Sequence, residues 1–433
     1  MLTIGDELLR GEIVDSNKAF LSERLLGLDI ETHYHASVRD EPVDMIDAFH
    51  RAAERSDVVL VSGGLGPTRD DLTAEVLARA FGLELHIDEE ALAGIRAFFA
   101  GVGREMTENN ATQARFPEGA EVLPNPIGTA PGFALEAERD GDRALFCCLP
   151  GVPREMVRMV DEQVLPRLAQ RLGAGQVVRA RLLRTFGVGE SSLDADLADV
   201  ATSGDVSLGF RTSFPENFLR PLARAASATE AEDKLEKICQ TLRERLGPVL
   251  YGEGDDTLES VVGRLLAERG LTLAVAESCT GGLIAQKLTD VAGSSAYFRG
   301  GVVAYANEAK RDLLGVPEAL LALHGAVSEP VARAMAAGAR ARFGADLAVA
   351  TTGISGPDGG SDEKPVGLVH LALEDAAGAH ADHFVFPLDR TRHRQLSAAV
   401  ALDWVRRRLI GAPLDGPSLL RRRGGASAPG GAS

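Results

Sequence analysis

Cysteine and tryptophan are scarce in this sequence, which has four cysteines and one tryptophan among its 433 residues. Two of the cysteines, Cys147 and Cys148, are adjacent, and this number and spacing do not make a disulfide framework. We therefore expect a protein of a reducing compartment, the cytoplasm. Long hydrophobic runs are also missing, because no segment reaches the roughly eighteen apolar residues of a membrane span. The first ten residues contain Asp6, Glu7 and Arg10, so we expect no signal peptide.

Positive charge is in short supply, and the formal net charge is −17. A nucleic-acid-binding protein needs a basic surface, so direct nucleic-acid binding is not expected. The nine histidines show no paired spacing of metal ligands, since His33 and His35 share a strand face without a third ligand. The composition is 45% hydrophobic and 25% charged, as in a soluble globular protein with room for two or three domains.

Residues 1–170 alternate between short apolar runs and amphipathic segments. Strands are predicted at residues 2–4, 30–38, 57–61 and 144–149, and helices at residues 17–26 and 43–55. This alternation predicts an α/β domain with a mainly parallel sheet, whose ligands bind at the carboxyl ends of the strands. Cys147 and Cys148 lie in one strand and point to opposite faces, so we expect both to be core residues.

Polar clusters follow three of these strands. A glycine-rich loop after a strand brings backbone close to phosphate groups, and neighbouring carboxylates could hold a divalent metal such as magnesium or cobalt against them. The predicted phosphate-binding residues are Gly63, Gly64, Gly66, Thr68 and Asn109, and the predicted metal ligands are Asp6, Asp40, Asp70 and Asp71. Each cluster taken singly is also compatible with an ordinary polar strand end.

Residues 172–250 change in character and predict a small α+β module of several strands and two helices. No Gly-x-x-Gly loop of the kind that RNA-binding KH domains use occurs between residues 172 and 252. We expect a spacer or dimerisation module, followed by a linker at residues 251–256. Residues 257–410 then predict a second α/β domain, and residues 411–433, rich in Gly, Ala, Ser and Pro, a disordered tail.

The second α/β domain opens with a strand and a helix that flank a dense polar turn at residues 276–282. Ser278 in this turn is either a helix cap or a nucleophile whose oxyanion the turn's N–H groups stabilise. Cys279 is a rival nucleophile, but no histidine nearby in sequence suits a thiolate pair, so a packing role is favoured.

Several motifs together resemble the CinA (competence/damage-inducible) family. Residues 5–17 and 63–73 are similar to the molybdopterin-binding fold of MogA and MoeA proteins, and residues 104–110 and 150–156 are further CinA signatures. Residues 172–250 resemble the family's KH-like middle domain, and residues 257–410 its C-terminal domain, which also occurs as the free-standing enzyme PncC. Relatives have several residues before the equivalent of Leu2, which suggests a start codon called too late.

The resemblance implies chemistry for both α/β domains. PncC-type enzymes hydrolyse nicotinamide mononucleotide (NMN) to nicotinate mononucleotide and ammonia without a cofactor, and their motif positions fall on Ser278 as nucleophile, Lys310 as base and Tyr305 as proton relay. The N-terminal half implies metal-dependent hydrolysis of ADP-ribose. The family also implies a homodimer. Two alternatives are a non-catalytic factor in competence or recombination and a molybdopterin-binding protein.

The phosphate of such a substrate calls for N–H and guanidinium donors. We expect the substrate-binding residues Glu277, Thr280, Gly281, Gly282, Thr352, Gly353, Gly356, Arg390 and Arg394. The two arginines are equally compatible with a solvated helix terminus.

Overall fold

The computed structural model describes residues 1–173, 176–200 and 204–414. The chain divides into two compact units, one of Met1–Arg179 with Arg224–Ala231 and one of Ala180–Ala223 with the described residues from Glu232 on. The predicted tail, residues 411–433, lies outside the described residues from residue 415 on. Among the described residues, no helix has both the length and the apolar character that crossing a membrane requires.

The N-terminal domain is built on a six-stranded sheet of order β2-β1-β3-β8-β7-β6. The first four strands in this order are parallel and the last two antiparallel, so the predicted mainly parallel α/β fold is confirmed. The strands are β1 Leu2–Ile4, β2 Ala36–Val38, β3 Val58–Ser62, β6 Glu121–Leu123, β7 Gly132–Arg139 and β8 Asp142–Leu149, and β4 Leu85–Ile87 pairs with β5 Arg115–Pro117 outside this sheet.

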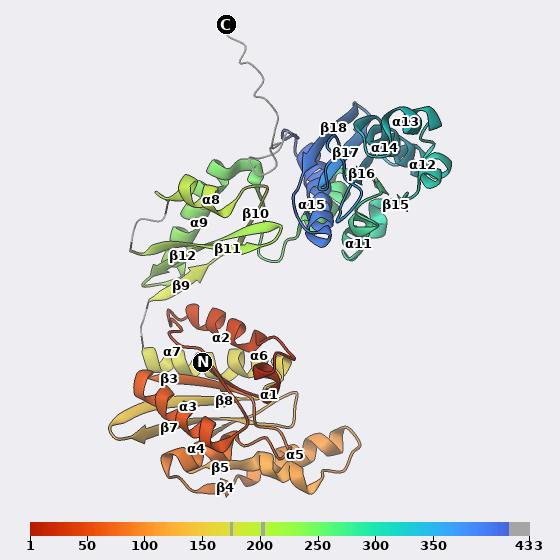
Figure 1. The fold of residues 1–433 in the computed structure, drawn as a ribbon. Coiled ribbons are helices and arrows are strands. Elements are labelled where there is room, and N and C mark those ends of the chain that lie inside the picture. The colour runs from red at the N-terminus through yellow and green to blue at the C-terminus, as the bar shows by residue number, and fades with distance from the viewer. Residues whose placement is uncertain (174–175, 201–203, 415–433) are drawn as a thin grey trace. The chain divides into compact units, whose positions relative to one another are not determined.

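Helices cover both faces of this sheet, which gives three layers (Figure 1). Helices α3 (Pro42–Arg55) and α4 (Thr73–Phe81) cover one face, and α2 (Ser16–Leu26), α6 (Pro153–Met159) and α7 (Leu165–Leu172) the other. Cys148 packs in the first core and Cys147 in the second, as strand alternation predicts. The remaining elements are α1 (Asp6–Leu9), α5 (Glu89–Gly101), the 3₁₀ helix Glu108–Ala114 and the π turn Val160–Val164.

One N-terminal strand is shorter than predicted. Only Ala36–Val38 of the expected strand at residues 30–38 pairs with β1, because β1 offers only three residues to pair with. Residues 31–35 run beside it without strand structure. The carboxyl end of the strand, which positions Asp40, is where the sequence placed it.

The middle module is an antiparallel sheet of order β11-β12-β10-β13 with β9 beside β12. Its elements are β9 (Val177–Ala180), β10 (Leu183–Phe186), α8 (Glu190–Leu197), β11 (Val206–Ser213), β12 (Glu216–Ala225), α9 (Ala228–Leu246), a 3₁₀ turn (Gly247–Val249) and β13 (Leu250–Glu253). The predicted linker at residues 251–256 is wrong in part, because Leu250–Glu253 pairs with β10 as an edge strand.

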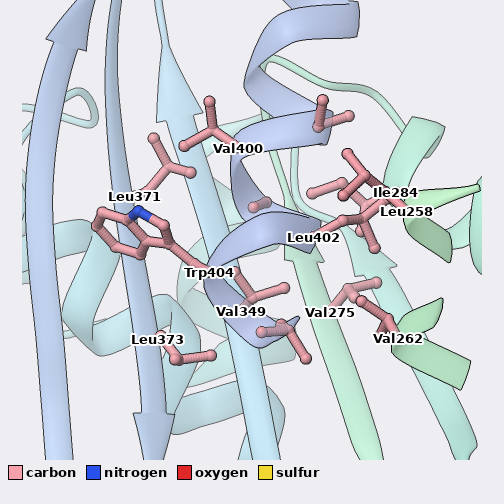
Figure 2. Packing of buried hydrophobic residues seen from close by; sticks show 14 of the residues in the cluster. Leu258, Val262, Val275, Ile284, Val349, Leu371, Leu373, Val400, Leu402 and Trp404 are labelled. Atoms are coloured by element: carbon pink, nitrogen blue, oxygen red, sulfur yellow. The ribbon is translucent and has the colours of Figure 1, made fainter. Parts of the chain in front are cut away.

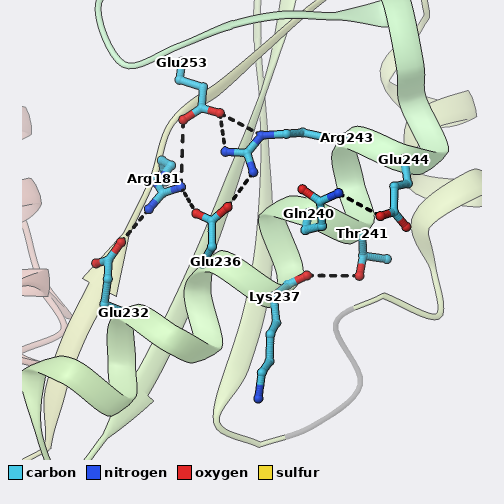
Figure 3. Close-up of polar contacts among 9 residues, drawn as sticks. All are labelled: Arg181, Glu232, Glu236, Lys237, Gln240, Thr241, Arg243, Glu244 and Glu253. Carbon is cyan, nitrogen blue, oxygen red and sulfur yellow. Dashed lines mark hydrogen bonds and ion pairs between the residues drawn. The ribbon is translucent and has the colours of Figure 1, made fainter.

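An ion-pair network ties α9 to this sheet (Figure 3). Arg181 contacts Glu232 and Glu236 of α9, and Arg243 contacts Glu236 and Glu253 of β13. Because Glu236 and Glu253 each face both arginines, the charges alternate in sign around the network. The network therefore links charged side chains of α9 to Arg181 and to Glu253 of β13.

The C-terminal domain has a five-stranded sheet of order β15-β14-β16-β17-β18. Its strands are β14 Leu273–Glu277, β15 Phe298–Val303, β16 Leu347–Gly353, β17 Leu368–Asp375 and β18 Gly378–Val385. The first three in spatial order are parallel, and β17 and β18 are antiparallel. Strands β14 and β16 are therefore central, and the segments after them meet at one edge of the sheet.

Helices again cover both faces. Helices α10 (Leu258–Arg269), α11 (Leu283–Thr289) and α15 (Arg390–Leu409) cover one, and α12 (Asn307–Leu314), α13 (Glu318–His324) and α14 (Glu329–Phe343) the other. Figure 2 shows Trp404 of α15 lying over Leu371 and Leu373 of β17. The single tryptophan therefore anchors the last helix to the sheet, and α15 in turn carries Arg390 and Arg394 at its start.

Candidate functional site

Ser278 is the first residue after the buried central strand β14. Its backbone N–H donates to the carbonyl of Thr351 on β16 at 3.0 Å, which continues the strand pairing by one residue. The side chain is 8% exposed and faces a cavity. The sheet itself therefore fixes the position of this hydroxyl.

Lys310 of α12 is a buried lysine, 1% exposed. Its Nζ lies 3.2 Å from Ser278 Oγ and donates to the carbonyls of Ala304 at 2.8 Å and Tyr305 at 3.2 Å. Among the described residues it has no carboxylate partner, and burial lowers its pKa below the usual 10.5. A neutral amine has two N–H groups and one lone pair, and this set of partners fits that form.

In the neutral form, the two N–H groups of Lys310 go to the two carbonyls, and the lone pair faces Ser278. The serine hydroxyl then donates its proton toward Nζ. This is the arrangement of a nucleophile and its general base within hydrogen-bond reach.

Glu277 has a different role from the predicted one. It is fully buried, and its carboxylate accepts the N–H groups of Gly282 at 3.0 Å, Ile284 at 3.1 Å and Ala285 at 2.8 Å. It therefore caps α11 instead of contacting substrate. The N–H of Gly281 is also engaged, by the Ser278 carbonyl at 3.1 Å, so the turn does not present the phosphate-binding N–H groups expected at Gly281 and Gly282.

Tyr305 and Arg390 form the outer part of the site. Tyr305 follows β15, is 61% exposed, and accepts a hydrogen bond on its hydroxyl from Arg390 at 3.0 Å. Arg390 also donates to the carbonyl of Gly356 at 2.8 Å. These two hydrogen bonds, one to a carbonyl and one to a phenol hydroxyl, hold the arginine at the mouth of the cavity.

The cavity has a volume of about 200 Å³ and gathers residues from five separate segments of the C-terminal domain. It brings together six of the predicted residues, namely Ser278, Tyr305, Lys310, Thr352, Gly353 and Arg390, with Cys279, Ala326, Val327 and Ser355 beside them. Thr352 donates its hydroxyl proton to the Ala326 carbonyl at 2.8 Å.

Thr280 and Arg394 do not reach this cavity. The guanidinium of Arg394 donates to the Thr280 carbonyl at 3.2 and 2.9 Å, and the Thr280 hydroxyl pairs with that of Thr351 at 2.8 Å. Both residues were predicted to bind substrate, and the structure instead uses them to tie α15 to the Ser278 turn.

Two residues that the sequence analysis passed over belong to the site. Ser355 lines the cavity, and its hydroxyl lies 2.9 Å from Nδ1 of His393, which is fully buried. The available signal was a serine in the glycine-rich segment after β16 and a histidine beside the two predicted arginines. Without the fold, nothing in the sequence joins the two.

The thiol of Cys279 is a poor nucleophile. Burial raises its pKa to about 12, so the thiolate is not populated near neutral pH. This agrees with the packing role expected of Cys279.

The N-terminal domain brings its glycine-rich loop to the end of β3. Gly63 and Gly64 have φ of 113° and 67°, which only glycine adopts readily, and a Cβ at Gly63 would collide with the Ile4 carbonyl. Asn109 lies against this loop, since its Nδ2 donates to the Pro67 carbonyl at 3.1 Å. The predicted convergence of Asn109 with the loop is therefore found.

Thr68 uses its own donors inside the loop. Its N–H donates to Asp71 at 2.8 Å, and its hydroxyl contacts both Asp70 and Asp71. Consequently Thr68 orients two carboxylates, and these two donors are not directed to a phosphate.

The four predicted metal ligands do not form a metal centre. Asp6 is paired with Arg10 and Arg39, and its N–H donates to Asp40 at 2.9 Å. The described residues contain no group of three or more His, Cys, Asp or Glu side chains placed to hold a metal ion. Arg10 and Arg39 neutralise Asp6, and Thr68 contacts Asp70 and Asp71. Within the described ranges Asp40 has no such compensation, because burial and then the nearby carboxylates of Glu7, Asp6 and Asp70 raise its pKa.

Comparisons with known proteins match most of the chain in three parts. Residues 1–170 match the probable molybdopterin binding domain, residues 180–252 the damage-inducible protein CinA KH domain, and residues 255–409 the CinA C-terminal domain.

Full-length relatives are similar along almost the entire chain. A CinA-like protein of Geobacter sulfurreducens is 48% identical over 412 residues, covering 95% of this chain and 99% of the relative. One of Geobacter metallireducens is 46% identical over 412 residues, covering 95% and 98%. Among solved structures, the competence/damage inducible protein CihA of Agrobacterium tumefaciens is 46% identical, covering 34% of this chain and 93% of its own, with a TM-score of 0.32.

Proposed function

The chain belongs to the CinA family, and from that premise we propose that its C-terminal domain hydrolyses the carboxamide of NMN to nicotinate mononucleotide and ammonia. The observation that carries the proposal is the 3.2 Å contact between Ser278 Oγ and the buried amine of Lys310. A serine hydroxyl needs a base to become a nucleophile, and a lysine of lowered pKa supplies one.

The first half of the reaction forms an ester on Ser278. The hydroxyl proton passes to Lys310 Nζ while Oγ attacks the carboxamide carbon, which gives a tetrahedral oxyanion. The N–H of Cys279 directly follows Ser278 in the turn, so it is the candidate donor to that oxyanion. Collapse of the intermediate breaks the C–N bond, and the lysine returns its proton to the leaving nitrogen as ammonia departs.

The second half releases the acid. Lys310, neutral again, takes a proton from water, whose oxygen attacks the ester carbon. Collapse breaks the bond to Ser278 Oγ, which recovers its proton from Lys310. The product is a carboxylate, and the balance is one amide and one water to one acid and one ammonia.

Arg390 supports the substrate assignment. Its guanidinium stands at the mouth of the cavity beside the exposed Tyr305, where the nucleotide phosphate would remain outside the ring pocket. Arginine makes bidentate contacts with phosphate that neutral residues do not replace.

The test is ammonia release from NMN by the wild-type protein and by Ser278→Ala, both with EDTA present. We expect turnover in wild type and a loss of about a thousandfold in the variant. Wild-type turnover that needs a metal, or an unchanged rate in Ser278→Ala, would overturn the proposal.

For the N-terminal domain we infer a nucleotide or pterin phosphate site, with ADP-ribose hydrolysis as its proposed activity. The convergence of Asn109 on the strained loop at Gly63 and Gly64 favours a ligand there. Since the aspartates do not form a metal centre, no hydrolytic step is derived from them. ADP-ribose turnover measured with added magnesium, with cobalt and with EDTA tests the activity, and absence of turnover in all three contradicts it.

A further inference from the structure

Ser355 and His393 form a hydrogen-bonded pair whose direction the surroundings determine. His393 is fully buried, with Nδ1 at 2.9 Å from Ser355 Oγ and Nε2 at 3.1 Å from the Gly367 carbonyl. A carbonyl only accepts hydrogen bonds, so Nε2 carries the proton. Burial lowers the pKa of His393, and the ring is therefore neutral with a lone pair on Nδ1.

This protonation pattern restricts what Ser355 offers to the cavity. The lone pair on Nδ1 must be satisfied by the Ser355 hydroxyl, which points its only proton at His393. Toward the cavity, Ser355 Oγ then has lone pairs alone. It accepts hydrogen bonds from a ligand and donates none.

We propose that Ser355 is the specificity-determining residue of this site. It accepts hydrogen bonds from the N–H groups of a carboxamide and disfavours binding of the carboxylate that replaces the carboxamide after hydrolysis. Both Ser355 and Ser278 line the same cavity, so a carboxamide attacked by one lies within the space that the other faces. The proposal rests on the proposed function, because it names how substrate and product of that reaction are told apart. His393 is a positioning residue that holds the serine proton away from the ligand.

The expected consequence is product release. A carboxamide donates through nitrogen, whereas a carboxylate has only acceptor oxygens, and placing these against the lone pairs of Ser355 leaves both sides without a proton. The buried acceptor then has no partner, which is the situation that gives strong discrimination between close analogues. The site thus favours the amide before hydrolysis and disfavours the acid after it.

A rival interpretation makes Ser355 a second nucleophile with His393 as base. An imidazolium at His393 would face the neutral carbonyl of Gly367, and Arg390 adds a repulsive positive charge nearby. Both ring nitrogens bond neutral groups, so no carboxylate among the described residues orients this histidine as the third group of a catalytic triad would. The surroundings of Ser355 and His393 therefore favour the neutral pair, in which the proton stays on the serine hydroxyl.

The experiment measures binding of NMN and of nicotinate mononucleotide by calorimetry in a Ser278→Ala background, in which the ligand is not consumed. We expect the amide to bind about tenfold more tightly than the acid, which corresponds to the contribution of one hydrogen bond. The Ser355→Ala substitution should reduce this ratio of dissociation constants to about twofold or less. Ser397→Ala is the matched control, since Ser397 is equally buried on α15 but bonds the His393 carbonyl and does not line the cavity.

His393→Gln gives a readout that a merely structural role would not produce. Glutamine can still donate to the Gly367 carbonyl but offers no acceptor where Nδ1 was, so the Ser355 proton is free to turn into the cavity. We expect affinity for nicotinate mononucleotide to rise about tenfold, with the melting temperature reported alongside. A drop in affinity for both ligands together would overturn the positioning role.

The outcomes separate this inference from the proposed function. Wild-type ammonia release with unchanged amide preference in Ser355→Ala overturns the inference and leaves the function standing. Amide preference that Ser355→Ala abolishes, in a wild type that releases no ammonia, supports the inference and overturns the function. Binding of neither ligand overturns both. A rate loss in Ser355→Ala as large as that in Ser278→Ala supports the rival nucleophile instead.

Discussion

The two α/β domains place charged groups at the ends of their strands in opposite ways. Among the residues that the structure describes, buried Lys310 of the C-terminal domain bonds only neutral groups, and buried Glu277 bonds only backbone N–H groups. In the N-terminal domain Asp6 is paired with two arginines, and Asp70 and Asp71 are satisfied by Thr68.

This difference affects how readily each site can transfer a proton. Burial without a counter-ion lowers the pKa of Lys310, which favours the neutral amine. In the N-terminal domain Arg39 lowers the pKa of Asp6, whereas burial raises that of Asp40. On physical grounds the C-terminal site is therefore the better suited of the two to proton transfer.

The largest effect expected is that of Lys310→Met. Methionine fills the buried space but cannot accept the serine proton, so we expect kcat for NMN hydrolysis to fall about a thousandfold. The control is Lys287→Met on α11, whose lysine pairs with Glu259 away from the cavity. Equal losses in both variants would show that lysine removal harms the fold and would erase the contrast between the domains.

The pH profile sharpens the same contrast. Neutral Lys310 is the active form, so kcat/KM should rise about tenfold per pH unit and level off below pH 10.5, at the lowered pKa. Stability should follow the same sign, because the unfolded chain binds the lysine proton more tightly than the folded one between the lowered pKa and 10.5, and the free energy of unfolding rises with pH in that window. A Lys310→Met variant that keeps the stability slope would contradict this assignment.

Glu277→Gln tests whether this carboxylate caps α11 or binds substrate. Loss of the charge weakens three N–H hydrogen bonds to a buried acceptor, so we expect the free energy of unfolding to fall by about 2 kcal/mol. Denaturant titration measures this, with Glu259→Gln as the control. A raised KM for NMN with unchanged stability would instead restore the substrate-binding role that the sequence suggested.

The smallest effect is expected in the N-terminal loop. Asp71→Ala removes the acceptor of the Thr68 N–H, and because the loop is exposed, water replaces it at a cost of about 0.5–1 kcal/mol. NMN hydrolysis should not change. A hydrolysis rate that falls with Asp71→Ala would mean that the two domains are coupled, and the comparison between them would no longer hold.

The sequence predicts the elements of this site better than their contacts. Ser278, Lys310 and Tyr305 are at the ends of elements that periodicity and motif locate within a few residues. The assignment of Glu277, Thr280 and Arg394 to substrate fails because a polar residue beside a helix start serves the backbone as readily as a ligand, and only the hydrogen-bond partners decide. His393 lies 38 positions from Ser355, and pairing at that separation has no local signal.

In the N-terminal domain, too, the sequence predicts the positions of side chains better than their contacts. The strand ends predict that the aspartates lie at one edge, but they do not predict the arginines that neutralise Asp6, which directly follow α1 and β2. Whether a charge is compensated depends on the directions in which side chains point, and the amino-acid composition does not give these directions. The expected homodimer stays a prediction, which light scattering of the purified protein would check.

The scarcity of cysteine has a practical consequence. The four free thiols are all buried, and each sits in a different core cluster: Cys279 and Cys239 in the C-terminal and middle cores, Cys148 and Cys147 on the two faces of the N-terminal sheet. A thiol reacts with a reagent only when its own layer opens. If three cysteines are replaced at a time, the labelling rate of the remaining cysteine measures how often its own layer opens transiently. The four thiols therefore report separately on where unfolding of the chain begins.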